Sequence, residues 1–192
     1  GVGKQASLID EAARRMNRRR YRSATEVAHL GRDPRRYLGA VNTPVFRAST
    51  ILLPTMADVE RAARGEYPAL SYGLHGLPTV TDLQRALATL EGGHAALAVP
   101  SGLTATTLPL LALLKPGDHL LVTDAVYGPT RRFCDNHMRR LGIDVGYYDP
   151  LAGAAIVDVF RPNTKLVFTE SPGSLTFDVQ DIRAIADAAH AR

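Results

Sequence analysis

The stretch LEGGHAALAVPSGLTATTLPLLALL, residues 90–114, determines how the chain is organised. Residues 91–93 end a preceding helix, and the apolar run Ala95–Val99 is short enough for a strand buried on both faces. Pro100-Ser101-Gly102 then breaks this strand, and a helix follows. The backbone N–H groups at the start of such a helix favour an anion, most often a phosphate. On this stretch alone we favour an ordinary strand-to-helix turn that binds nothing, because Ser-Gly before a helix is common.

The composition excludes several classes of protein. The chain has 192 residues, of which 45% are hydrophobic and 22% charged, as in an ordinary globular protein. A single cysteine, Cys134, rules out a disulfide framework, and with His137 it forms too small a set for a zinc site. We therefore expect no metal. No apolar run approaches the roughly 20 residues of a membrane span, so we expect a cytoplasmic protein.

The net charge of +4 is concentrated near the N-terminus. Six arginines share one short segment there: Arg14, Arg15, Arg18, Arg19, Arg20 and Arg22. This segment is compatible with a nucleic-acid-binding arm, which gives one alternative function. We favour a solvated arm without nucleic acid, because no aromatic platform or helix-turn-helix pattern accompanies the arginines.

We expect residues 1–68 to form an irregular N-terminal arm or clasp, and residues 69–192 to form the first part of an α/β domain. Within the arm we expect helices at Thr25–Leu30 and Met56–Arg64. The domain begins with a glycine-rich loop around Tyr72, and Thr79 or Thr81 then caps a helix over Asp82–Leu90.

After residue 114 strands and helices alternate. The predicted strands are His119–Thr123, Ile143–Tyr148 and Lys165–Thr169. The predicted helices are Thr130–Leu141, ended by Gly142, then Ala154–Phe160 and Val179–Ala189. Such alternation predicts a parallel sheet with helices on both faces and a ligand at the carboxyl ends of its strands. Three loops should meet there: residues 101–103, 124–127 and 170–171. Because the chain stops on a helix, we expect it to be the N-terminal part of a longer protein.

The order of several short motifs resembles the pyridoxal-phosphate (PLP) enzymes of cysteine and methionine metabolism, and within them the bacterial cystathionine beta-lyases. The motifs are Gly39-Ala40-Val41-Asn42, Arg47-Ala48-Ser49-Thr50, Tyr72-Gly73, Pro78-Thr79, Leu90-Glu91-Gly92-Gly93, Ser101-Gly102, Gly117-Asp118-His119, Tyr127, Asp149-Pro150 and Glu170-Ser171-Pro172-Gly173-Ser174. The resemblance implies the aspartate-aminotransferase-like large domain, called fold type I, here truncated. The Gly173-Ser174 ending favours the beta-lyase branch.

The resemblance also implies roles for individual residues. Ser101, Gly102 and Leu103 would bind the cofactor phosphate, and Tyr127 would stack on the cofactor ring close to the reacting bonds. Tyr72 would reach the phosphate of a neighbouring subunit in a dimer of dimers. Where many relatives carry an arginine two residues after this tyrosine, the chain has Leu74.

A PLP enzyme also needs a Schiff-base lysine. The chain has three lysines, Lys4, Lys115 and Lys165, and none stands where the loops converge. We therefore expect this chain alone to be inactive and the intact protein to cleave cystathionine to homocysteine, pyruvate and ammonia, a step in methionine biosynthesis. The alternatives within the family are a gamma-lyase, a gamma-synthase and a sulfhydrylase.

Overall fold

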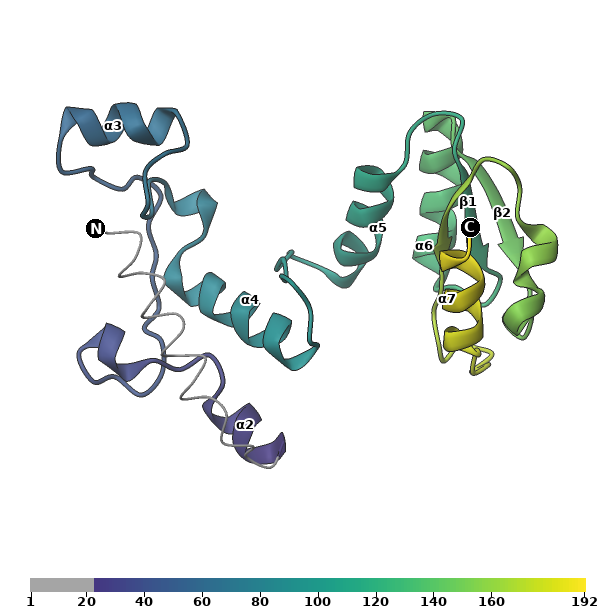
Figure 1. Ribbon diagram of the computed structural model, residues 1–192, viewed down its shortest axis with the longest axis horizontal. Coiled ribbons are helices and arrows are strands. Elements are labelled where there is room, and N and C mark those ends of the chain that lie inside the picture. The colour runs from purple at the N-terminus through teal and green to yellow at the C-terminus, as the bar shows by residue number, and fades with distance from the viewer. Residues whose placement is uncertain (1–22) are drawn as a thin grey trace. The chain divides into compact units, whose positions relative to one another are not determined.

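The computed structural model describes residues 23–192. The arginine-rich segment, residues 14–22, and Lys4 lie outside the described residues. Backbone contacts divide the chain into two compact units at the Ala98–Val99 junction (Figure 1). The predicted boundary between arm and domain, at residues 68 and 69, stays a prediction.

Within residues 23–98, the first unit holds three α-helices joined by irregular segments (Figure 1): α2 (Ser23–His29), α3 (Met56–Ala63) and α4 (Pro78–Leu90). Short 3₁₀ turns lie at Pro34–Tyr37 and Gly73–His75. The helices α2 and α3 confirm the predicted ones to within a residue or two.

The centre of the first unit is a buried carboxylate, Asp82, on α4. It accepts hydrogen bonds from the Tyr37 hydroxyl at 2.7 Å and the Thr43 hydroxyl at 2.8 Å. The guanidinium groups of Arg36 and Arg85 lie 3.4 and 3.2 Å from its other oxygen. Among described residues of this unit only Tyr37 and Asp82 are buried, so polar contacts rather than an apolar core connect its segments.

The second unit is a three-stranded parallel sheet with the strand order β2-β1-β3. Its strands are β1 (His119–Thr123), β2 (Asp144–Tyr148) and β3 (Thr164–Phe168). Strands β1 and β2 pair in register from His119–Asp144 to Thr123–Tyr148, whereas the pairing of β1 with β3 shifts between His119 and Leu120. The parallel sheet expected from the sequence is thus confirmed.

Helices cover both faces of the sheet (Figure 1). Helix α5 (Gly102–Leu113) and helix α6 (Gly128–Phe133) share a core with Leu120 and Val122 of β1. The opposite face, beginning with Leu121, packs on a 3₁₀ segment (Gly153–Val159) and on α7 (Ile182–His190). Leu120 and Val122 face one side of the sheet and Leu121 the other, because successive side chains of a strand point to opposite faces.

Several predicted elements differ from the structure. Ala95–Val99 is not a strand, and Leu97 is 70% exposed, because no described strand pairs with this run. Helix α4 begins at Pro78 rather than Asp82, so the predicted threonine caps at 79 and 81 are wrong. The fixed φ of proline suits the first helical position and needs no N–H acceptor there.

The helix predicted over Thr130–Leu141 has three parts. Helix α6 passes into a π-helical turn (Cys134–Met138) and a 3₁₀ turn (Arg139–Leu141). The predicted stop is confirmed, since Gly142 adopts the left-handed φ of 80°. Helix α7 starts three residues later than predicted, because the Asp181 carboxylate caps it by accepting from the Ala184 N–H at 3.0 Å.

Within residues 23–192, no helix combines the length and the apolar character that a membrane crossing requires.

Candidate functional site

The start of helix α5 presents backbone donors to an open space. Ser101 caps the helix, and its hydroxyl accepts from the Thr104 N–H at 3.1 Å and lies 2.8 Å from the Thr104 hydroxyl. Helix geometry leaves the N–H groups of Gly102 and Leu103 without an acceptor inside the helix. A methyl group built on Gly102 would meet nothing within 4 Å. Several donors and the positive end of the helix dipole therefore face a space that an anion can enter.

Tyr127 lies in the loop that follows the carboxyl end of β1. It precedes the first residue of α6, and its ring is 50% exposed. The Tyr127 N–H donates to the Glu170 carboxylate at 3.1 Å, which joins the loop after β1 to the loop after β3. The predicted meeting of residues 124–127 with residues 170–171 is confirmed, and Tyr127 stays half exposed there.

A second contact joins the same two loops through their backbones. The Ser174 N–H donates to the Ala125 carbonyl at 2.8 Å. A Cβ atom on Gly173 would lie only 2.6 Å from the Cβ of Ala125, so glycine is needed for this approach. The Ser171–Pro172 peptide bond in the same loop is cis.

Asp124 has a structural partner. The Arg131 guanidinium donates to the Asp124 carbonyl at 2.7 Å and also to its carboxylate. The same guanidinium lies 4.0 Å from the centre of the Tyr147 ring. Burial and a hydrogen bond to Asp135 raise the pKa of the Tyr147 hydroxyl, so this tyrosine stays neutral. These contacts support a turn-stabilising role for Asp124 rather than a role in chemistry.

Sequence reasoning missed Gln180, which is buried beneath the loop after β3. A lone glutamine before a helix carries no sequence signal, and only the fold shows that its amide lies among the strand ends.

Tyr72 belongs to the first unit. Its ring is 41% exposed and lies edge-on to His75, with the two ring centres 5.7 Å apart. The Tyr72 backbone pairs with Thr50, and its hydroxyl lies 3.4 Å from the Ser49 hydroxyl. Gly73 makes this close approach possible, because a Cβ there would lie 2.2 Å from the Ala48 carbonyl oxygen. Two motifs that are distant in sequence therefore meet, and the exposed Leu74 lies beside them.

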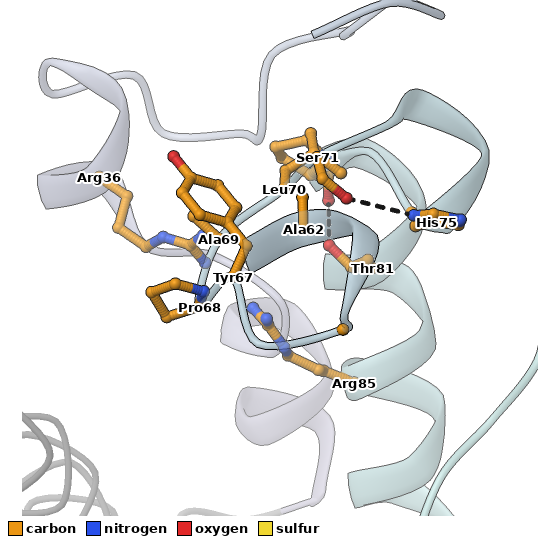
Figure 2. A pocket seen from close by; sticks show the side chains of 13 residues that line it. Arg36, Ala62, Tyr67, Pro68, Ala69, Leu70, Ser71, His75, Thr81 and Arg85 are labelled. Carbon is orange, nitrogen blue, oxygen red and sulfur yellow. Dashed lines mark hydrogen bonds between the residues drawn. The ribbon is translucent and has the colours of Figure 1, made fainter. Parts of the chain in front are cut away.

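The first unit also contains a cavity of about 630 Å³ (Figure 2). Figure 2 shows the guanidinium groups of Arg36 and Arg85 extending toward Tyr67 and Pro68. The Ser71 hydroxyl lies 3.4 Å from the His75 ring nitrogen on another wall (Figure 2). Tyr72 is not part of the lining, so the cavity lies next to the tyrosine loop without including its phenol.

The two described lysines lie at the amino ends of strands. Lys115 is exposed in the turn before β1, and Lys165 is the second residue of β3 and also exposed. Tyr127 and Glu170 follow the opposite, carboxyl ends of those strands. Within residues 23–192 no lysine reaches the loops where Tyr127 lies.

Comparison with known proteins identifies the family. The sequence model described as "Cys/Met metabolism PLP-dependent enzyme" matches residues 24–192. The chain belongs to this family. Its cofactor is pyridoxal phosphate, and the expected resemblance and fold class are confirmed.

Relatives within the family carry more than one activity. A candidate cystathionine beta-lyase of Rhizobium johnstonii is 49% identical over 86% of this chain and 41% of its own length. Cystathionine beta-lyase MetC of Escherichia coli is 39% identical over 85% of this chain and 42% of its own. An L-alanine/L-glutamate racemase of Wolbachia pipientis is 41% identical over 85% of this chain and 42% of its own length.

A solved structure of metB from Corynebacterium glutamicum superposes with a TM-score of 0.77 at 28% identity, over 87% of this chain and 42% of that one. The chain therefore spans less than half the length of the curated relatives it matches.

The residues of the second unit fit part of the family's cofactor. The donors at the start of α5 suit a phosphate, and the exposed Tyr127 ring suits a flat pyridine ring. No described lysine of this family member lies where it would bond the cofactor covalently.

Proposed function

We propose that the second unit holds the phosphate and the ring of PLP, and that the intact protein is a carbon–sulfur beta-lyase acting on cystathionine. The observation that carries this proposal is that the second unit has both an open helix start behind Ser101, at the beginning of α5, and a half-exposed Tyr127 in the loop after β1. The first gives phosphate donors and the second gives a stacking face.

Each residue has a distinct task in this proposal. The N–H groups of Gly102 and Leu103 bind the phosphate, and the Ser101 hydroxyl adds to them. The Tyr127 ring orients the cofactor, and its hydroxyl donates its proton to the sulfur as the C–S bond breaks, so that homocysteine leaves as a thiol. The Glu170 carboxylate accepts a hydrogen bond from the Tyr127 N–H and so holds the Tyr127 backbone. When bound, the cofactor supplies an electron sink for the carbanion that forms at the substrate Cα.

Tyr72 completes the proposal in the first unit. We assign its hydroxyl to the phosphate of a neighbouring subunit in a homo-oligomer, since it is exposed and its own unit offers it only a weak contact with Ser49. Leu74 brings no charge to that phosphate, and the His75 ring lies 5.7 Å from the Tyr72 ring.

The chain alone should bind PLP without a specific covalent lysine adduct. Borohydride reduction of the chain with PLP, followed by mass mapping, tests this directly. Stoichiometric labelling of Lys115 or Lys165 would refute our placement of the site. Saturable binding without labelling, weakened by Ser101→Ala, would support it.

The reaction itself is tested on the intact protein with cystathionine. Pyruvate together with homocysteine supports beta elimination, whereas 2-oxobutyrate would indicate a gamma-lyase. The racemase relative gives a second candidate function from the same family. Conversion of L-alanine to D-alanine, without pyruvate from cystathionine, would favour that function and contradict the lyase proposal.

A further inference from the structure

The side chain and the backbone N–H of Gln180 make four hydrogen bonds in the interior of the second unit, where the residue is 6% exposed. Its side-chain Nε2 donates to the Thr123 hydroxyl at 3.1 Å and to the Glu170 carbonyl at 2.6 Å. Its Oε1 accepts from the Tyr148 hydroxyl at 2.8 Å, and its backbone N–H donates to the Ser171 hydroxyl at 2.9 Å. Every polar atom of the amide is therefore satisfied, as burial requires.

These partners come from the carboxyl ends of all three strands. Thr123 ends β1, Tyr148 ends β2, and Glu170 stands two residues after the end of β3. Burial raises the pKa of the Tyr148 hydroxyl to about 12, so it stays protonated and donates to the amide. One amide group thus joins three strand ends at the edge where the proposed site lies.

Glu170 connects this amide to Tyr127. The Gln180 side chain donates to the Glu170 carbonyl, and the Glu170 carboxylate accepts from the Tyr127 N–H at 3.1 Å. We propose that Gln180 is a positioning residue, which fixes Glu170 so that its carboxylate holds the loop that presents Tyr127. The inference rests on the proposed function only in taking the Tyr127 ring as the cofactor's stacking partner.

If Gln180 positions Glu170, then the hydrogen bonds that its NH₂ group donates matter. If it only fills space, an apolar side chain of similar size would serve as well. The Glu170 carbonyl only accepts hydrogen bonds, so a carboxylate at position 180 would be repelled by it. A protonated carboxyl at that position would restore one donor, and burial raises the pKa of such a group above its usual value near 4.3. The variant Gln180→Glu should therefore recover on acidification, whereas the similarly sized Gln180→Met should not.

The experiment measures hydrogen exchange at single amides of the full chain without cofactor. Protection factors of Tyr127 and of Leu121, at the centre of β1, are compared at about pH 5 and about pH 8, each against the unsubstituted chain. We expect Gln180→Met to lower Tyr127 protection about tenfold at both pH values while Leu121 keeps its protection, because a buried hydrogen bond is lost locally. Gln180→Glu should show this loss at about pH 8 and regain most of it at about pH 5.

The control is Gln84→Glu on α4, which adds the same charge in the first unit and should leave Tyr127 unaffected at both pH values. Unchanged Tyr127 protection in Gln180→Met would overturn the inference. An equal loss at Tyr127 and Leu121 would also overturn it, since it would reveal a general stabilising role. If Gln180→Glu unfolds at about pH 8, refolding on acidification supports the inference and persistent unfolding contradicts it.

The result is independent of cofactor binding. A chain that fails to bind PLP would refute the proposed function and leave the exchange data standing. Normal PLP binding with unchanged exchange would refute only the role of Gln180.

Discussion

Replacing Gly173 by alanine should push apart the two loops that build the proposed site. The new Cβ would lie 2.6 Å from the Cβ of Ala125 and 3.0 Å from the Thr176 hydroxyl oxygen. Non-bonded carbon atoms normally lie about 3.5–4.0 Å apart, so the two methyl groups would be roughly 1 Å too close. Neither can rotate away, because a Cβ atom is fixed by its backbone.

The backbone cannot retreat without loss. The Ser174 N–H donates to the Ala125 carbonyl at 2.8 Å, and the Gly173 N–H donates to the Asp178 carbonyl at 2.9 Å. Overpacking costs about 1–3 kcal/mol, and weakening one of these hydrogen bonds adds about 1 kcal/mol. We therefore expect Gly173→Ala to lower the free energy of unfolding by about 2–4 kcal/mol. Gly173 is not among the glycines with positive φ, so this loss comes from the contact.

A double-mutant cycle isolates the contact. Ala125→Gly alone should cost about 1 kcal/mol, for a lost buried methyl group and a more flexible chain. Adding it to Gly173→Ala removes the clash, so the double variant should be more stable than the sum of the two single effects by at least about 1 kcal/mol. Urea unfolding followed by circular dichroism measures all four proteins. Additivity of the two changes to within about 0.5 kcal/mol would refute the reasoning.

Three further predictions concern other buried groups. His119 is fully buried, and burial lowers its pKa, so on acidification the unfolded chain binds the proton before the folded chain does. The free energy of unfolding should therefore fall as the pH drops below about 6.5. In acid titrations, His119→Gln should reduce this dependence. Asp82→Ala leaves the buried Tyr37 hydroxyl without its acceptor and should destabilise the first unit by about 1–3 kcal/mol, seen as faster limited proteolysis, while Asp82→Asn should cost less. The Cys134 thiol is fully buried, and burial raises its pKa to about 11, so it should react with Ellman's reagent only after unfolding; rapid reaction of the folded chain would contradict the structure.

The sequence by itself determined most of the local elements and the family. The strand at His119–Thr123 was predicted to the residue, because a short apolar run lies between the turn at Gly117-Asp118 and Asp124. The alternation of strands and helices was sufficient for a parallel sheet covered on both faces. The sequence also placed Ser101 before a helix and Tyr127 after a strand, since both positions follow from chain order alone.

The tertiary structure decided what depends on partners distant in the sequence. Ala95–Val99 has strand-like residues but is not a strand, because a strand needs a neighbour to pair with and no described segment provides one. The contact between Gly173 and Ala125 and the four hydrogen bonds of Gln180 join residues that lie 9 to 57 positions apart. Local propensity carries no information about such contacts. They exist only after the strands have brought their carboxyl ends to one edge of the sheet.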